Sequence, residues 1–266
     1  MVLCSSRVLL LKQIKAAFQI LFVMVKHLRW IQLIMSSFSF TTIATIHSPY
    51  KEKFAVPRQP GLVPSAIALL EIHSPYNDIN AFSGLEDFSH LWLTFVFHKN
   101  KQQTDWQPMV RPPRLGGNKR VGVFATRSPN RPNPIGLSLV EFHGIVQKQG
   151  KLFLRLSNID LVDGTPVIDI KPYIPYADAK PDASAGFAQQ TPETTMTIEF
   201  SLAAQQIADE DPQLKALITE ILQQDPRPAY KKGSIDNKIY AVHLLDFNIT
   251  WQVSEEITTV QTIDKR

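Results

Sequence analysis

Seven short apolar segments separated by turn-forming residues constrain the fold more than any other feature of this sequence. They are rich in Val, Ile, Phe and Thr and are bounded by Pro, Gly, Asn and Asp, as β-strands are. Apart from a short helix expected near Ala81–Leu85, no helical period interrupts them. This pattern favours an antiparallel barrel or sandwich over a parallel Rossmann sheet. The expected strands are Phe40–Ile46, Ala66–Ile72, Leu91–Phe97, Val121–Thr126, Ile135–Val146, Leu152–Leu161 and Val167–Ile170.

The last part of the chain has a different pattern. Residues 174–192 are rich in Pro, Ala and Asp without a clear period, which indicates a linker. Helical spacing at Leu214–Leu222 predicts a helix that begins near Asp211-Pro212. Strands are expected at Met196–Leu202, Lys238–Asp246 and Asn248–Val253. The predicted organisation is an extension (1–34), a mainly β domain (35–175), a linker (176–192) and a small α+β domain (193–266).

Cysteine and histidine usage excludes several kinds of site. The only cysteine of the 266 residues is Cys4, so disulfides, cysteine zinc sites and thiol catalysis are excluded within the predicted domains. The seven histidines lack the spacing of a metal-binding helix, so no metal is expected. Both features fit a cytoplasmic protein.

Residues 1–34 contain five Lys or Arg, no acid and the apolar run Ala16–Val25. A signal peptide is one interpretation, but Gln19 interrupts the run and no small-residue cleavage site follows closely. Ten residues between Lys15 and Lys26 are too few to span a bilayer. The favoured interpretation is a mis-assigned start or a dispensable extension, with Met35 as the expected first residue.

The charge distribution is more informative than the net charge of +4, because the extension alone contributes five positive charges and leaves −1 for the rest. Residues Lys99–Arg131 contain eight Lys or Arg and one acid, Asp105. A basic face on an otherwise acidic body is expected of a protein that contacts phosphates. The alternative is a solvated loop that happens to be basic.

The run VFATRSPNRPNPIGLSLV (residues 123–140) places Arg127 and Arg131 on a stiff backbone. Three prolines and two asparagines lie within the seven residues that follow Arg127, and each proline restricts its own φ and the residue before it. Guanidinium groups held in this way suit a carboxylate or a nucleic-acid backbone. The alternative is a surface loop whose arginines are only solvated.

These residues also carry a resemblance to the TrmO (TsaA-like, YaeB) family of S-adenosylmethionine-dependent tRNA adenosine N6-methyltransferases. It implies a single-sheeted antiparallel β-barrel, a homodimer, and methylation of N6 of threonylcarbamoyladenosine at position 37 in the anticodon loop of tRNA. The resemblance rests on five blocks in order: SPYKEKFAVPRQPGLV (48–63), FSHLWLTFVFH (88–98), VRPPRLGGNKRVGVFATRSPNRPNPIG (110–136), LVDGTPVIDIKPY (161–173) and DPRPAY (225–230).

The resemblance also implies a set of cofactor-binding residues, although the dinucleotide fingerprint G-x-G-x-x-G is absent. Arg127 would pair with the methionine carboxylate, Phe97 and Leu137 would hold the adenine, and Asp160 would take a hydroxyl or amine. The whole set is Gln59, Pro60, Gly61, Phe97, His98, Arg127, Leu137, Ser157, Asn158, Ile159 and Asp160. The position of His98 at the end of an apolar strand favours a structural interpretation, whereas the resemblance implies a pocket residue that is not the catalytic base.

Contacts to tRNA are expected from basic residues outside that set. The candidates are Arg114, Lys119, Arg120, Arg131, Arg227, Tyr230 and Lys231, extended by Lys232, with single-stranded bases recognised by stacking and edge contacts. The catalytic residue is left open. Asp160, Asp163 and Asp169 are the carboxylates that could accept the N6 proton, and a backbone carbonyl or water would also serve.

Two alternatives to this function remain. One is a non-catalytic module that binds S-adenosylmethionine or tRNA as a sensor or adaptor. The other is a methyltransferase on the same fold with a different methyl acceptor.

Overall fold

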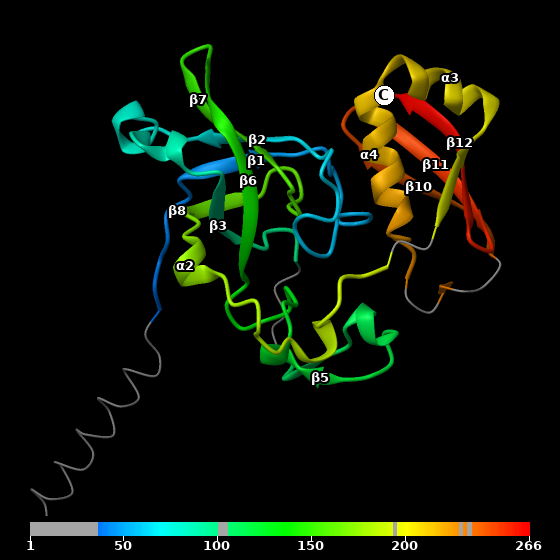
Figure 1. Cartoon of the computed structure of the whole chain (residues 1–266), viewed down its shortest axis with the longest axis horizontal. Helices are drawn as coiled ribbons and strands as arrows, with labels where there is room; N and C mark the ends of the chain where they lie inside the picture. Colours follow the sequence, from blue (N-terminus) through cyan, green and yellow to red (C-terminus); the bar gives the residue numbers. More distant parts are fainter. Residues whose placement is uncertain (1–36, 101–105, 194–195, 229–230, 233–235) are drawn as a thin grey trace, which may run out of the picture. The chain divides into compact units, whose positions relative to one another are not determined.

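The computed structural model describes residues 37–100, 106–193, 196–228, 231–232 and 236–266 (Figure 1). The chain divides into two units, Met1–Thr41 and Thr42–Arg266. Of the first unit, residues 37–41 are described and have no regular secondary structure. The expectation for residues 1–34 lies outside the described residues.

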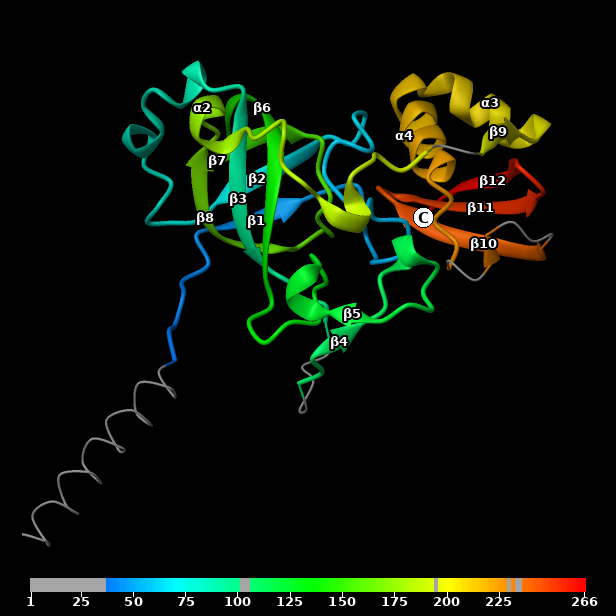
Figure 2. The same cartoon turned by 60° about the horizontal axis from the view of Figure 1, so that its bottom comes forward.

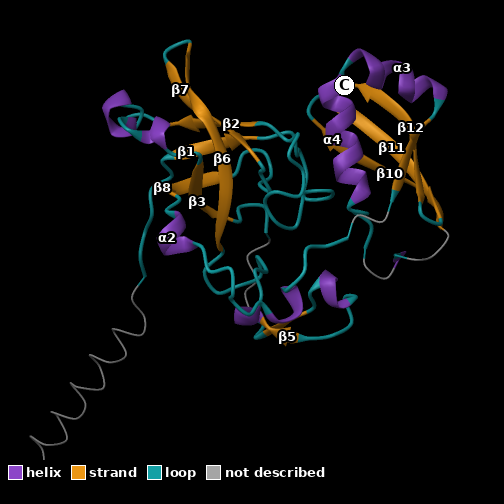
Figure 3. Cartoon of the chain, in the orientation of Figure 1, coloured by secondary structure: helices purple, strands orange, loops and turns teal. Residues whose placement is uncertain are grey.

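Six strands form a closed ring in the order β1-β2-β7-β6-β3-β8 (Figure 3). Every neighbouring pair in the ring is antiparallel. The mainly β architecture expected from the sequence is therefore confirmed. The strands are β1 (Ala44–His47), β2 (Ala68–Ile72), β3 (His90–Val96), β6 (Ile135–Lys148), β7 (Lys151–Ser157) and β8 (Pro166–Pro172).

Alternating side chains explain why these segments close around a core. In β3, Leu91, Leu93 and Phe95 are buried and the residues between them are partly exposed, which is the period of a strand with one apolar face. The long hairpin of β6 and β7 turns at Gln149 and Gly150, whose φ angles are 53° and 74°. Positive φ at both turn positions matches the twist of the flanking strands.

The C-terminal residues form a second, four-stranded sheet in the order β10-β11-β12-β9 (Figure 1). Its strands are β9 (Thr197–Phe200), β10 (Asp236–Leu244), β11 (Phe247–Ser254) and β12 (Ile257–Lys265), with β9 parallel to β12. Two helices, α3 (Leu202–Glu210) and α4 (Pro212–Gln223), contact this sheet. The predicted start of α4 is confirmed, because the Asp211 carboxylate accepts the backbone N–H of Leu214 at 3.0 Å.

The predicted strand Val121–Thr126 is wrong beyond Gly122. Residues Val121–Gly122 (β5) pair with Met109–Val110 (β4) in a small hairpin (Figure 2). The chain then turns into a 3-10 helix at Val123–Ala125 (η4), with only Val123 buried. Phe124 is 74% exposed, so the apolar alternation there does not mark a buried face.

Shorter elements complete the structure. The expected helix near Ala81–Leu85 is two 3-10 turns, η1 (Ile79–Phe82) and η2 (Leu85–Asp87). A further 3-10 turn, η3 (Pro113–Leu115), follows β4. The segment expected to be a linker contains α2 (Pro175–Asp178) and η5 (Gly186–Ala188).

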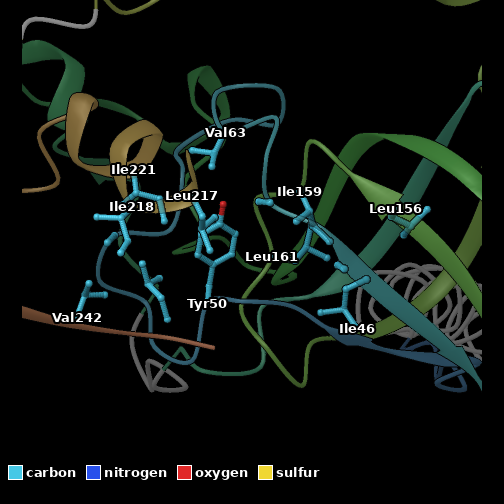
Figure 4. Packing of buried hydrophobic residues seen from close by; sticks show 14 of the residues in the cluster. Ile46, Tyr50, Val63, Leu156, Ile159, Leu161, Leu217, Ile218, Ile221 and Val242 are labelled. Atoms are coloured by element: carbon cyan, nitrogen blue, oxygen red, sulfur yellow. The ribbon is translucent and has the colours of Figure 1, made fainter. Parts of the chain in front are cut away.

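Tyr50 joins the six-stranded ring to the C-terminal helix α4. Its ring is fully buried between Leu161 on one side and Leu217 and Ile221 of α4 on the other (Figure 4). The residue also forms an isolated β-bridge with Leu244. Residues Thr42–Arg266 therefore share one continuous apolar core.

Candidate functional site

The expected cofactor-binding residues come from four segments that meet beside β6. Strand β3 runs antiparallel to β6, so Phe97 and His98 follow β3 where β6 begins. Strand β7 is the other neighbour of β6, and residues 158–160 continue beyond its end toward Ser138. The loop of Gln59 and the loop of Arg127 approach the same region. Six residues of this set take part in the hydrogen bonds described below: Gln59, Gly61, Arg127, Ser157, Asn158 and Asp160.

Arg127 and Gln59 are in direct contact. Arg127 Nη1 donates to Gln59 Oε1 at 2.6 Å, and Arg127 remains exposed. Gln59 Nε2 donates in turn to the carbonyl of Arg58 at 2.5 Å. The guanidinium of Arg127 is thus held by a neutral amide. Because this amide carries no charge, the contact does not neutralise the positive charge of Arg127.

The loop of Gln59 docks on the segment that follows β7. The backbone N–H of Gly61 donates to the carbonyl of Asn158 at 3.2 Å. Gly61 has a φ of 81°, a conformation that glycine adopts at little cost. Asn158 also has a positive φ, 58°. Two unusual backbone conformations therefore face each other where the two loops meet.

Among the expected cofactor-binding residues, which we call the cluster, Asp160 has the most strongly shifted pKa. Burial raises the pKa of Asp160 from 3.8 to about 6, opposed by its hydrogen bond from Ser138, by a backbone hydrogen bond and by the charge of Arg127. Ser138 Oγ donates to Asp160 Oδ1 at 2.5 Å. A carboxylate with a shifted pKa in a cluster of polar side chains is typical of a functional site.

A second polar network fixes the turn at Ser157 and Asn158. Glu141 Oε2 accepts from Ser157 Oγ at 3.0 Å and from Asn158 Nδ2 at 3.1 Å, and His143 Nε2 contacts Ser157 Oγ at 2.7 Å. Asn158 Oδ1 is buried and has no hydrogen-bond partner among the described residues. A buried acceptor without a donor is costly, so this oxygen is suited to accept from a ligand.

Sequence reasoning did not single out Ser138 or Glu141. Ser138 is 2% exposed at an inward position of β6. A small polar residue among inward-facing apolar residues could have indicated a functional position in the sequence. Glu141 offered no such signal, because its partners lie at the end of another strand, β7.

Aromatic and apolar residues form the other wall of the cluster. The rings of Phe95 and Phe97 meet edge to face, with centroids 5.1 Å apart. Gly136 allows this packing, since a Cβ there would lie 2.2 Å from the Phe95 ring. Leu137 follows Gly136 in β6 and is 55% exposed. Exposed apolar side chains and aromatic rings provide surfaces on which a flat aromatic group can pack.

His98 is exposed, and its imidazole makes no hydrogen bond with the other described residues. Its pKa is lowered by burial and by the charge of Lys99. The imidazole Nε2 lies 3.9 Å from the position of a Cβ at Gly164. A neutral His98 packed beside the turn at Gly164 fits either of the interpretations that its sequence position left open.

The other two candidate carboxylates are engaged in local structure. Asp163 accepts the backbone N–H of Ser48 at 2.9 Å and pairs with Lys51 at 3.0 Å. Asp169 pairs with Lys171 and accepts the backbone N–H of Ile170 at 3.0 Å. Among the three candidates, Asp160 is therefore the one that lies within the cluster.

Basic residues expected to contact tRNA fall into two groups. Arg114, Lys119 and Arg120 are exposed on the turn between β4 and β5. Arg131 is partly buried, and its Nη2 donates to the carbonyl of Thr126 at 3.1 Å. Arg131 therefore supports the backbone just before Arg127.

The expectation that Arg227 contacts phosphate at the surface is corrected. Arg227 is 1% exposed, and its guanidinium forms two hydrogen bonds with Asp225, at 2.8 and 3.0 Å. A buried bidentate pair of this kind is structural. Lys231 is partly buried and Lys232 is exposed, whereas Tyr230 lies outside the described residues.

The described residues contain no group of three or more His, Cys, Asp or Glu placed to hold a metal ion. No helix in the described part of the chain is long and apolar enough to cross a membrane.

Comparisons with known proteins cover nearly all of residues 45–266. The family described as the tRNA-methyltransferase O N-terminal domain matches residues 45–179, and the TrmO C-terminal domain matches residues 193–266. A tRNA (adenine(37)-N6)-methyltransferase of Escherichia coli K12 is 53% identical over 236 residues, which cover 87% of this chain and all of that protein.

A curated relative and a solved structure, both from Pseudomonas aeruginosa, are also similar to this chain. A putative S-adenosylmethionine-dependent methyltransferase, RcsF, is 46% identical over 80% of this chain and 91% of its own length. A crystal structure of TrmO is 37% identical and covers 86% of this chain and 99% of the solved one, with a TM-score of 0.69.

Proposed function

The chain belongs to the TrmO family of tRNA (adenine(37)-N6)-methyltransferases, and from that premise we propose that it methylates N6 of threonylcarbamoyladenosine at position 37 of tRNA. We propose S-adenosylmethionine as the methyl donor, by analogy with the relative that carries that description. The observation that supports this proposal best is the cluster of Arg127, Gln59, Asn158 and Asp160 beside β6.

The side chains of the cluster fit S-adenosylmethionine, which supplies an electrophilic methyl group when bound. The guanidinium of Arg127 suits the methionine carboxylate. The buried Oδ1 of Asn158 has no donor among the described residues, and the Asp160 carboxylate can accept from a hydroxyl or an amine. Phe97 and Leu137 provide apolar surface for the adenine. The remaining contacts would come from Pro60, Gly61, His98, Ser157 and Ile159.

The protein's part in catalysis is then mainly positioning, because the donor methyl is already activated. The loops of Gln59 and Arg127, joined by a hydrogen bond, would hold the groups that bind the ligand. For the N6 proton we propose Asp160 as acceptor, since Asp163 and Asp169 are paired with lysines. With a pKa of about 6, Asp160 is mostly ionised at neutral pH, so it can accept a proton. Because this pKa is close to neutral pH, the carboxylate is also more basic than an ordinary aspartate.

Exposed Arg114, Lys119 and Arg120 form a basic turn that suits the phosphates of the anticodon stem and loop. We also propose that residues 35–175 and 193–266 form two domains and that the protein is a homodimer. A cytoplasmic location follows from the substrate, because tRNA is found there. Sedimentation equilibrium of the purified protein tests the dimer directly.

Nucleoside mass spectrometry of tRNA from a knockout strain tests the activity. The methylated form of threonylcarbamoyladenosine should disappear and the unmethylated form should accumulate, and a plasmid copy of the gene should reverse both changes. Persistence of the methylated nucleoside in the knockout would refute the proposal. If the protein were a non-catalytic binding module, the knockout would leave the amount of the methylated nucleoside unchanged. If it were a methyltransferase with another acceptor, the knockout would change a different nucleoside.

A further inference from the structure

A cavity of about 290 Å³ lies next to the cluster and has no role in the proposal above. Three segments line it: Phe54 and Arg58 of the loop after β1, the turn at residues 113–118, and residues 226–228 after α4. This lining brings together parts of the chain that are far apart in sequence. Its described lining residues include two arginines and no acid.

Arg58 is the exposed charged residue in the lining of this cavity. Its side chain is exposed and takes part in no hydrogen bond or ion pair of the described residues. Pro57 and Pro60 flank Arg58 and Gln59, and each proline restricts the backbone on its own side. Asn118 also lines the cavity and is exposed, and its amide can donate a hydrogen bond.

The nearby charges leave an excess of positive charge. Asp225 is the acid that acts on Arg58, and its carboxylate is occupied by the two hydrogen bonds from Arg227. The pKa of Lys232 is lowered mainly by burial; the charge of Asp225 opposes this shift, and the charges of Arg58 and Arg227 add to it. Cations that destabilise one another in this way are stabilised by an anion.

The cavity adjoins the proposed cofactor site through consecutive residues. Arg58 lines the cavity, and Gln59, the next residue, holds Arg127. A group bound at Arg58 would therefore contact the residue next to Gln59, which supports the cluster through Arg127.

We propose that this cavity is a subsite for an oxyanion of the RNA substrate, with Arg58 as its main ligand and Asn118 as a second donor. This inference rests on the proposed function and deepens it. The oxyanion would be the carboxylate of the threonylcarbamoyl group or a backbone phosphate, which share the chemistry that a guanidinium recognises.

The test compares wild-type protein with Arg58→Gln on two tRNAs, one with threonylcarbamoyladenosine at position 37 and one with plain adenosine there. Binding of each tRNA is measured by fluorescence titration, methylation of the modified tRNA by initial rates, and S-adenosylmethionine affinity by calorimetry. We expect Arg58→Gln to lower kcat/KM at least tenfold, with cofactor affinity within twofold of wild type. Arg58→Lys should recover part of the loss, and Asn118→Ala should show a smaller one.

The two tRNAs identify the source of the oxyanion. If Arg58→Gln weakens binding of the modified tRNA alone, the carboxylate occupies the subsite, and equal weakening of both tRNAs assigns it to a phosphate. Unchanged tRNA affinity and kcat/KM would overturn the inference, as would a loss matched by the exposed control Lys148→Gln. Wild-type protein that fails to methylate the modified tRNA would instead refute the proposed function.

Discussion

Arg127 is the residue on which the proposed cofactor site most depends. It is exposed, it is held by Gln59 at 2.6 Å, and it lies near enough to Asp160 to lower the pKa of that carboxyl. Arg131, four residues later, bonds to the backbone carbonyl of Thr126 instead. The two arginines of the proline-rich run therefore differ in what they contact.

We expect Arg127→Ala to weaken binding of S-adenosylmethionine by about 10- to 100-fold, the range for a hydrogen bond to a charged group. Gln59→Ala should have a smaller effect, because Gln59 only orients the guanidinium. Calorimetric titration measures both. Unchanged affinity in Arg127→Ala, with Lys148→Gln as the matched control, would rule out a carboxylate contact.

The raised pKa of Asp160 predicts how stability depends on pH. Because its pKa is about 6 in the folded protein and 3.8 ordinarily, the folded state binds this proton more tightly than the unfolded state. The contribution to stability is full below about pH 4 and is lost as the pH rises through 6.

Asp160→Asn removes this titration, so its free energy of unfolding relative to wild type should rise between pH 4 and pH 7 by up to about 3 kcal/mol. Urea unfolding at several pH values measures the difference. A difference that stays constant across this range would show that Asp160 does not titrate as inferred.

At the scale of elements, the contact between β3 and β6 depends on a missing side chain. Gly136 pairs with Phe95, whose ring occupies the space that a Cβ would need. Phe95 in turn packs edge to face against Phe97 of the proposed cofactor site.

Gly136→Ala should therefore destabilise the protein by about 1–3 kcal/mol, as overpacking does, and should also weaken cofactor binding by displacing Phe97. Thermal unfolding and calorimetry measure the two effects. Adding Phe95→Leu to the variant makes room for the methyl group and should restore much of the stability. No recovery in the double variant would contradict a steric cause.

The secondary structure was predictable where burial and local propensity agree. β3 alternates strictly, and α4 has both helical spacing and the Asp211 cap, so both were found from the sequence. β12 is rich in Thr and α3 is largely polar at its surface, so neither was expected. Their stability comes from contacts with each other and with β9 and β11, which no local pattern records.

At the scale of the whole molecule, α4 supports the loop of the proposed cofactor site. Glu220 of α4 accepts from the backbone N–H of Ser65 at 2.9 Å and from its Oγ at 2.7 Å. Ser65 follows the loop that contains Gln59 and Gly61. The C-terminal helix therefore fixes one end of that loop.

Glu220→Ala should destabilise the protein by about 1–2 kcal/mol through the loss of these bonds and should weaken cofactor binding several-fold. Glu220→Gln keeps an acceptor oxygen and serves as the matched control, with effects expected to be smaller. Chemical unfolding and calorimetry measure both variants. Equal cofactor affinity in all three proteins would mean that α4 does not support the site.

The sequence by itself determined most of the strands, the start of α4 and the basic turn, because periodicity, turn residues and charge are local properties, whereas the residues expected in the cluster came from the resemblance to the family. Tertiary structure decided the rest. It buried Arg227 against Asp225, placed Ser138 on Asp160, and left Arg58 as the charged group of a cavity. Burial depends on residues distant in the chain, so the sequence did not distinguish the buried Arg227 from an exposed arginine, although its partner Asp225 is only two residues away.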